Sequence, residues 1–215
     1  MSSMHRLVTT AVLLALAPAM LPAQVGKGLL DLNTATEAEL AALPGMSAAI
    51  VKDFVGRRPF ATIVEADAAL RPALDSAARV AVYRKAFIHV NLNAASDAEL
   101  ALIPDAGRRT IGEMKEYRPY DGFAKFRKEL GKYRFIREKA GELERLESYS
   151  FIPLDLNSAG DDDLRTIPGL GARMLREFKE YRPYDGMAKF RKEIAKYVPA
   201  REVERLARYV EVRGR

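Results

Sequence analysis

The chain has 215 residues, of which 48% are hydrophobic and 30% are charged, a composition typical of globular proteins and not of disordered ones. Its formal net charge of +6 is the balance of 35 basic and 29 acidic residues, so a mildly basic, mixed surface permits nucleic-acid binding without requiring it. There is no cysteine, which excludes disulfides, thiolate metal sites, a cysteine nucleophile and the lipidated cysteine of a bacterial lipoprotein.

The N-terminus has the pattern of a secretory signal peptide. A basic residue, Arg6, precedes an apolar run over 7–21, and small residues follow. We predict a signal peptide over 1–23 with cleavage after Ala23, Ala19 being the alternative site. The run is shorter than the roughly 20 apolar residues of a membrane-spanning helix. We therefore expect a periplasmic or secreted protein, with a retained N-terminal anchor as the lesser alternative.

The remainder contains three copies of one pattern. Each copy has a Leu-Asn dipeptide, a proline eleven residues after the asparagine, and an Arg-Pro step twenty-five residues after it. These positions are Asn33, Asn93 and Asn157; Pro44, Pro104 and Pro168; and Arg58-Pro59, Arg118-Pro119 and Arg182-Pro183. We predict three tandem units over 24–88 (unit 1, the most divergent), 89–152 (unit 2) and 153–215 (unit 3).

Each unit is expected to hold about four short helices, which makes the fold class all-α. Thr36 with Glu39 and Ser96 with Glu99 have capping-box spacing and predict the start of a first helix; in unit 3 Gly160 takes the cap position. A second helix must end before the Arg-Pro step, because proline disfavours helical backbone in the residue before it. A third helix follows, and a fourth is expected over 76–85, 138–149 and 200–210. The apolar segments 87–90 and 151–154 are predicted to be extended connectors, with no sheet of consequence. Since each unit is small for a core of its own, we expect neighbouring units to pack together or the connectors to brace them.

No arrangement for catalysis is evident. Three acids, Asp161 to Asp163, begin the first helix of unit 3, where they suit the helix dipole; a metal site is the lesser alternative, since adjacent side chains on a helix diverge. His89 is the only histidine after the signal segment and has no partner pattern. We expect no enzyme, no metal, no cofactor and no small-molecule substrate.

The repeated pattern resembles a known family. Leu-Asn-x-Ala-Ser/Thr, then Glu-Leu, then Leu/Ile-Pro-Gly-x-Gly, then a helix ending in Tyr-Arg is similar to the helix-hairpin-helix repeat of ComEA-type competence DNA receptors. The match covers about the first 30 residues of each unit. It implies paired helix-hairpin-helix motifs that bind double-stranded DNA without sequence preference, through backbone amides donated to phosphate oxygens at a helix N-terminus. The third and fourth helices would form a second hairpin, which here is degenerate: 133–136 and 197–200 hold no Gly-x-Gly.

The DNA-binding positions carry over unevenly. Unit 3 matches fully, unit 2 has Asp105 at the first glycine, where a carboxylate is unfavourable near a phosphate, and unit 1 has Ser47 at the second. The resemblance therefore implies these candidate DNA contacts: Pro168, Gly169, Leu170, Gly171, Ala172 and Arg173 in unit 3, Gly107, Arg108 and Arg109 in unit 2, and Gly45 in unit 1. Charge follows the same order, with 14 basic and 11 acidic residues in unit 3 against near balance in the other two.

Other basic and aromatic residues allow two interpretations. The cations of the third helices could contact phosphates or lie on a solvated face paired with Glu129 and Glu193; they are Lys125, Arg127, Lys128, Lys189, Arg191 and Lys192. Four tyrosines could stack on bases, but packing at the joint of the second and third helices is favoured; they are Tyr117, Tyr120, Tyr181 and Tyr184. The arginine of each Arg-Pro step is expected to pack over a tyrosine or cap a helix end.

Two functions follow as hypotheses. The first is an exported, non-enzymatic protein that binds the double-stranded DNA backbone weakly and without sequence specificity. The second is a repeat scaffold with an envelope protein partner, in which the eroded hairpins no longer bind DNA.

Overall fold

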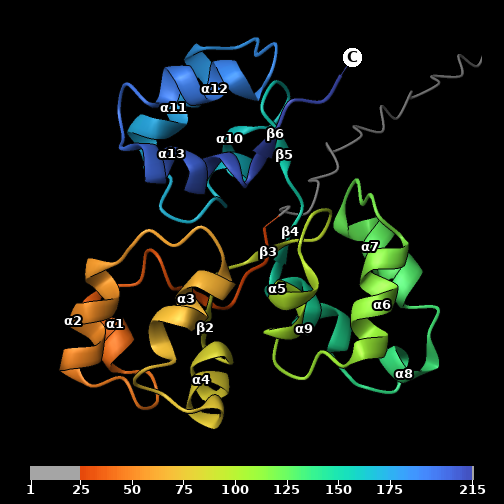
Figure 1. Cartoon of the computed structure of the whole chain (residues 1–215). Coiled ribbons are helices and arrows are strands. Elements are labelled where there is room, and N and C mark those ends of the chain that lie inside the picture. Colours follow the sequence, from red (N-terminus) through yellow and green to blue (C-terminus); the bar gives the residue numbers. More distant parts are fainter. Residues whose placement is uncertain (1–24, 215) are drawn as a thin grey trace, which may run out of the picture.

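The computed structural model describes residues 25–214, so the predicted signal segment and both of its cleavage sites lie outside the described residues. Figure 1 shows three helical lobes that meet at the middle of the molecule. The described chain is mostly helical, as the sequence predicted, and forms thirteen short helices where about four in each unit were expected.

The helices and strands follow the same order in each unit. Unit 1 contains β1 (Leu30–Asp31), α1 (Glu37–Ala41), α2 (Ala48–Gly56), α3 (Ile63–Leu70), α4 (Ser76–Tyr83) and β2 (Ala86–Phe87). Unit 2 contains β3 (Val90–Asn91), α5 (Asp97–Ala101), α6 (Arg108–Glu116), α7 (Phe123–Leu130), α8 (Arg134–Arg137), α9 (Glu142–Ser148) and β4 (Ser150–Phe151). Unit 3 contains β5 (Leu154–Asp155), α10 (Asp161–Leu164), α11 (Ala172–Glu180), α12 (Met187–Ile194), α13 (Ala200–Ala207) and β6 (Val210–Glu211).

The extended connectors form paired strands. This corrects the expectation that the chain has no sheet of consequence. β1 pairs with β2, β3 with β4 and β5 with β6, each as a parallel two-residue ladder. Phe87, Ile88, Phe151 and Ile152 are fully buried there, so their backbone groups need partners inside the protein. A parallel pair needs a long crossover, and the helices of each unit supply it. Each ladder therefore joins the beginning of a unit to its end.

The helix starts follow the predicted capping signals. Thr36 and Ser96 each accept the N–H of the glutamate three residues later, and that glutamate accepts the N–H of the cap residue in return. Gly160 begins α10 without a side-chain cap. The fourth helix of unit 2 starts later than the predicted range of 138–149, because α9 begins only at Glu142, and the short helix α8 that precedes this range was not predicted. Gly141 sets the start of α9, since its φ of 73° is left-handed backbone that a helix interior does not allow.

The repeated asparagine fastens the start of each unit to the residue after the Arg-Pro step. In unit 3 the Asn157 Nδ2 donates to the carbonyl of Tyr184 at 2.9 Å, and its Oδ1 accepts the Tyr184 N–H at 2.7 Å. Asn93 does the same with Tyr120, and Asn33 with Phe60. Each contact spans 27 residues, which explains why the asparagine and the Arg-Pro step keep a constant separation.

The arginine of the Arg-Pro step has a role that neither prediction anticipated. Arg182 donates to the carbonyl of Ala159 at 2.8 Å, and Arg118 and Arg58 donate to those of Ala95 and Ala35. The acceptor lies just before the first helix of the same unit, not at the end of a helix. This contact and the paired hydrogen bonds of the asparagine therefore hold the first and second helices together in the same way in all three units.

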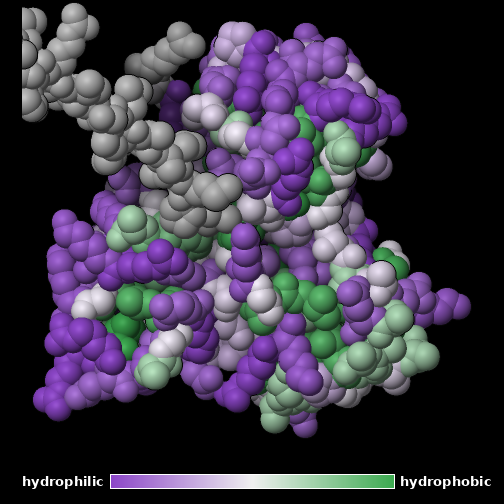
Figure 2. Space-filling model, turned by 180° about the vertical axis from the view of Figure 1, so that it is seen from behind, coloured by the Kyte–Doolittle hydropathy of each residue, from purple (hydrophilic) through white to green (hydrophobic). Residues whose placement is uncertain are grey.

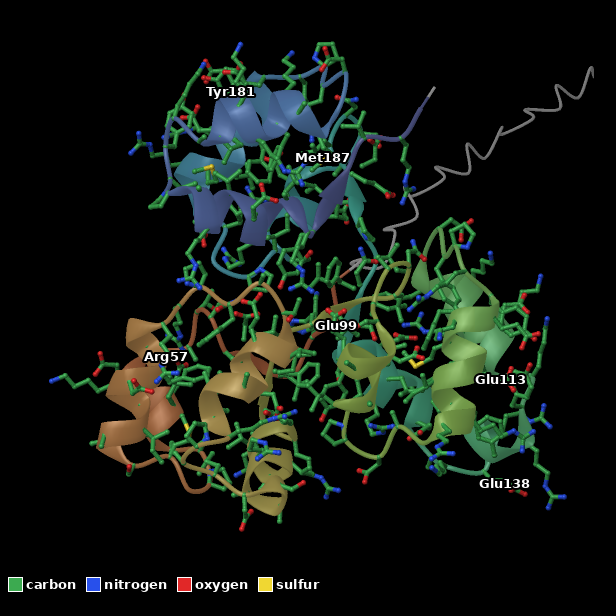
Figure 3. All side chains as sticks on the ribbon, in the orientation of Figure 1. Arg57, Glu99, Glu113, Glu138, Tyr181 and Met187 are labelled. Carbon is green, nitrogen blue, oxygen red and sulfur yellow. The ribbon has the colours of Figure 1, made fainter. Side chains whose placement is uncertain are left out.

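The buried core extends across the units. One apolar cluster runs from Leu32 to Ile152 through units 1 and 2, and a second fills unit 3 and includes Val25 and Phe151. The Phe87 and Tyr149 rings meet edge to face at 5.0 Å, which joins the closing segments of the first two units. Glu99, near the middle of the molecule in Figure 3, accepts a hydrogen bond from Arg208 of unit 3 at 3.3 Å. Neighbouring units thus pack on one another, as their small size predicted.

The outer surface is largely polar. Figure 2 shows hydrophilic residues over most of the visible face, with hydrophobic residues in the recesses of the lobes. Val80 is the large hydrophobic residue that stands exposed among residues 25–214. In the same part of the chain, no helix combines the length and apolar character that a membrane crossing requires.

Candidate nucleic-acid interface

Three hairpins join the first and second helices of the units: the first hairpin at 43–47, the second at 103–107 and the third at 167–171. They follow the same backbone path. Gly45, Asp105 and Gly169 hold the position after the proline, with left-handed φ values of 75°, 64° and 74°. Aspartate is one of the few residues with a side chain that enters this region. Asp105 therefore keeps the turn that glycine makes in the other two units.

The hairpins differ in how the second helix begins. Ser47, Gly107 and Gly171 are the N-cap residues of α2, α6 and α11, all in extended backbone with φ between −68° and −74°. Glycine is not needed for this conformation, and a Cβ at 107 or 171 would meet no atom within 4 Å. The difference is chemical: the Ser47 hydroxyl accepts the N–H of Ile50 at 3.4 Å, whereas glycine has no side chain to cap the helix. The first-turn N–H groups of α6 and α11 thus have no side-chain cap, the arrangement that binds anions.

An arginine lies two residues after each uncapped glycine. The guanidinium of Arg109 lies 4.2 Å from the Phe135 ring centre, and that of Arg173 lies 5.5 Å from the Tyr197 ring centre. Contact with an aromatic face holds a cation in place while its edge stays available to an anion. Both arginines are exposed, as are Gly107, Arg108, Gly171 and Ala172. Unit 1 has Ala49 at the matching position.

The second hairpin lies against unit 1. Both carboxylate oxygens of Asp105 accept hydrogen bonds from Arg84, at 2.9 and 3.1 Å. Arg84 ends α4, and a cavity of about 430 Å³ between α4 and the hairpin is lined by Val80, Tyr83 and Gly107, among others. The charge that made this hairpin doubtful thus has a cationic partner, although both side chains stay more than half exposed.

The third hairpin also meets unit 1. A Cβ placed on Gly169 would lie 2.9 Å from Thr34 Cγ2 and 3.3 Å from Arg205 Nη2. Glycine is therefore required at 169 by the left-handed backbone and by the close approach. Pro168 donates nothing, but its carbonyl accepts from Arg205 Nη1 at 2.8 Å. Leu170 is buried and anchors the turn.

Two of these residues, Thr34 and Arg205, gave no signal in the sequence. Thr34 belongs to another unit, and Arg205 lies in the last helix, outside the repeated motif. The spacing of three between Glu202 and Arg205 is compatible with an ion pair on one helix face but gives no indication of the hairpin.

The acidic start of α10 is engaged by neighbouring cations. Lys179 donates to Asp161 at 2.6 Å, and this hydrogen bond lowers the pKa of the Asp161 carboxyl. Arg165 donates to Asp162 at 2.8 Å. Over residues 25–214 no three acidic or histidine side chains gather as metal ligands would.

Most cations of α7 and α12 have partners on the protein. Arg127 pairs with Glu147 at 2.5 Å and Arg191 with Glu204 at 2.8 Å. Lys125 and Lys189 donate to the carbonyls of the prolines that precede their helices. The paired-face interpretation is thus favoured, but with different partners than predicted: Glu129 and Glu193 pair with Lys132 and Lys196.

The four tyrosines pack as predicted at the joint of the second and third helices. Tyr120 and Tyr184 are buried against Phe126 and Phe190, and burial raises the pKa of Tyr184 to about 12. The hydroxyls of Tyr117 and Tyr181 form hydrogen bonds with those of Tyr133 and Tyr197. Lys132 and Lys196 lie over the Tyr117 and Tyr181 rings, 5.4 and 5.0 Å from the ring centres, so packing within the protein is the favoured interpretation.

Comparison of the chain with protein-family models, with curated proteins and with solved structures finds no match in any of the three. The chemistry of the site therefore rests on its own geometry. Two of the three hairpins combine an uncapped helix N-terminus with an adjacent exposed arginine, and the first hairpin has neither.

Proposed function

We propose that this is an exported, non-enzymatic protein of the ComEA type that binds the backbone of double-stranded DNA without sequence preference. Phosphates are bound at the third hairpin by the N–H groups that follow Gly171 and by Arg173, and at the second by those that follow Gly107 and by Arg108 and Arg109. The first hairpin, with Gly45, is structural. Export rests on the signal pattern over 1–23.

A single observation carries the proposal. The second helix is capped by its own serine in unit 1, but in units 2 and 3 it starts with an uncapped glycine that has an arginine two residues after it. Since glycine is not needed there for the backbone, its presence leaves donors open to an outside acceptor. A phosphate oxygen is the acceptor that an adjacent guanidinium also favours.

The first test is binding of mature protein, from residue 24, to labelled duplexes of unrelated sequence across a salt series. We expect similar affinities for all sequences and a steep fall with salt, because counterions are released when phosphates are neutralised. Absence of binding at the lowest salt would remove the proposal.

A sharper test exchanges the caps of units 1 and 3. Gly171→Ser meets no steric obstacle, and its hydroxyl can accept the N–H of Met174 as Ser47 accepts that of Ile50. We expect unchanged or slightly higher stability and roughly fivefold weaker DNA binding. Ser47→Gly is the matched control and should not weaken binding. Equal affinities of Gly171→Ser and wild type would show that the uncapped amides are not the contact.

One observation favours the scaffold alternative. The second and third hairpins both lie against unit 1, through the Asp105–Arg84 pair and the Gly169–Thr34 contact. Under this alternative the hairpins join units, and a different surface binds an envelope protein. The double variant Gly171→Asp with Arg173→Glu should then leave partner capture from an envelope extract intact. Loss of the captured protein with this variant would count against the scaffold.

A further inference from the structure

An ion pair on α13, whose arginine is buried, contacts the third hairpin from the inside. Arg205 is only 3% exposed. Its Nε and Nη2 donate to the two carboxylate oxygens of Glu202 at 2.7 and 2.6 Å, and its Nη1 donates to the Pro168 carbonyl at 2.8 Å. The two hydrogen bonds to Glu202 hold the planar guanidinium in one orientation, so its hydrogen bond to Pro168 fixes the position of that carbonyl.

Unit 2 contains the same contact, although the number of residues between the proline and the arginine differs. Arg145 donates through Nε and Nη2 to Glu142 at 2.8 and 2.9 Å, and its Nη1 donates to the Pro104 carbonyl. The arginine lies 41 residues after the proline in unit 2 and 37 residues after it in unit 3. The same three-way contact is thus kept although the connection between hairpin and last helix is four residues longer.

Unit 1 has alanine at both matching positions. Counting back from the closing strands, Glu202 and Glu142 correspond to Ala78, and Arg205 and Arg145 correspond to Ala81. Ala78 Cβ lies 3.9 Å from a Cβ placed on Gly45, so the position that matches the glutamate borders the first hairpin but carries no charge there. The ion pair therefore occurs in the two units with an uncapped second helix, and is missing from the unit whose serine caps it.

We propose that Arg205 and Arg145, each held by its glutamate, are positioning residues for the phosphate-binding hairpins. This rests on the proposed function. The arginine fixes the proline carbonyl from the buried side, while Leu170 N–H bonds to the Ile167 carbonyl within the turn. The next peptide groups then enter α11 with their N–H groups directed outward. Because the glutamate neutralises the guanidinium, the role is orientation of the amides and not attraction of the anion.

The test compares Arg205→Met with Arg191→Met in mature protein. Both remove an arginine that pairs with a glutamate of α13, but the Arg191–Glu204 pair is exposed and does not reach the hairpin. Binding of a labelled duplex, amide exchange at 170–174 and the thermal midpoint are measured for each. We expect Arg205→Met to weaken binding about fivefold and to speed exchange at the hairpin amides, and Arg191→Met to change neither by more than about twofold. Arg205→Lys should restore part of both, since its ammonium can still donate to the carbonyl.

The outcomes separate the two proposals. If wild-type protein binds DNA and folded Arg205→Met binds as tightly as Arg191→Met, the positioning role is wrong and the proposed function stands. If wild type binds no DNA, the proposed function fails, and equal exchange at the hairpin amides in the two variants would overturn the positioning role as well. Should Arg205→Met not fold, Glu202→Gln replaces it, because it keeps the arginine and weakens only its hydrogen bonds to residue 202. Unchanged binding and exchange in Glu202→Gln would equally overturn the positioning role.

Discussion

An asparagine side chain can bind both the N–H and the C=O of one residue, because it offers an acceptor and donors on a single planar group. Asn157 uses both with the same residue, Tyr184, and so satisfies an N–H and a C=O that lie next to the cis Arg182-Pro183 peptide. No other residue of similar size can do this: aspartate lacks the donor, and leucine, which is almost isosteric, lacks both.

Replacing this asparagine should therefore be costly. We expect Asn157→Ala to lower the free energy of unfolding by about 2–4 kcal/mol, because two backbone groups lose their partners. Asn157→Asp should cost nearly as much, since the carboxylate faces the Tyr184 carbonyl without a proton to donate. Urea denaturation of the mature protein measures both. An aspartate variant as stable as wild type would contradict the role of these paired hydrogen bonds, and Asp162→Ala on the surface of the same unit is the control.

The sequence showed that these asparagines recur but not what they bind. The constant spacing to the Arg-Pro step was visible, yet the two residues are 27 positions apart and no local pattern links them. The same limit applies to Arg182, whose acceptor, the Ala159 carbonyl, is a backbone atom that leaves no mark in the sequence. Local capping signals at Thr36 and Ser96, in contrast, were read correctly because both partners lie within four residues.

At the scale of the element, the second hairpin has the backbone conformation of the other two but carries a different charge. Asp105 makes the left-handed turn that glycine makes elsewhere, and its carboxylate pairs with Arg84. The sequence comparison marked this substitution as unfavourable for a phosphate, and the structure shows that the backbone path of the hairpin is kept. What changes is the charge beside the uncapped start of α6.

Removing that charge should strengthen DNA binding. We expect Asp105→Gly to change stability by less than about 1 kcal/mol, since relief of the left-handed backbone offsets the loss of an exposed ion pair. Duplex affinity should rise, because one carboxylate leaves the site and Arg84 is freed. Asp105→Asn is the matched variant, since asparagine tolerates the same backbone without the charge. Salt-dependent binding curves decide the matter, and an asparagine variant with wild-type affinity would show that the charge is irrelevant.

The glutamate that holds Arg145 makes unit 2 sensitive to acid. The hydrogen bond from Arg145 lowers the pKa of Glu142 below its ordinary value of 4.5. The folded state therefore binds this proton less readily than the unfolded state, so the stabilisation is complete above the unfolded pKa and is lost as the pH falls through the folded one. We expect the difference in unfolding free energy between wild type and Glu142→Gln to shrink between pH 6 and pH 3. The unfolding free energy of Arg145→Met should itself depend less on pH over this range than that of the wild type, because Glu142 then lacks the partner that lowers its pKa. A difference between wild type and Glu142→Gln that stays constant across the pH series would contradict the pair.

At the scale of the whole molecule, three repeats form one body. Repeat spacing predicted the units, and marginal size predicted that they pack together, but not which surfaces meet. The junction contacts join residues far apart, such as Thr34 with Gly169 and Glu99 with Arg208, and only one member of each lies in a recognisable motif. The strand pairs were also missed, because a two-residue strand has too few positions for alternation to appear.

The junction of units 1 and 3 can be tested at Gly169. An alanine there must adopt left-handed backbone and places its methyl 2.9 Å from Thr34 Cγ2 of unit 1, whereas at Gly45 the nearest atoms, Leu74 Cδ2 at 3.2 Å and Ala78 Cβ at 3.9 Å, belong to the same unit. Gly45→Ala therefore reports the backbone cost, about 1–2 kcal/mol, together with a close contact that stays within unit 1. We expect Gly169→Ala to cost more by about 1 kcal/mol or more, because the neighbouring unit must shift.

Thr34→Ser isolates the contact between the units, since it removes Cγ2 and leaves the backbone at 169 strained. In a double-mutant cycle with Gly169→Ala it should recover the part of the excess over Gly45→Ala that comes from Thr34, while the close approach to Arg205 Nη2 inside unit 3 remains. The same serine should not rescue Gly45→Ala. Chemical denaturation gives the four free energies. Additive values would mean that the third hairpin does not press on unit 1. A recovered excess would mean that the hairpin with the intact motif is also the one that fixes the arrangement of the units, so its glycine serves the fold and the phosphate site together.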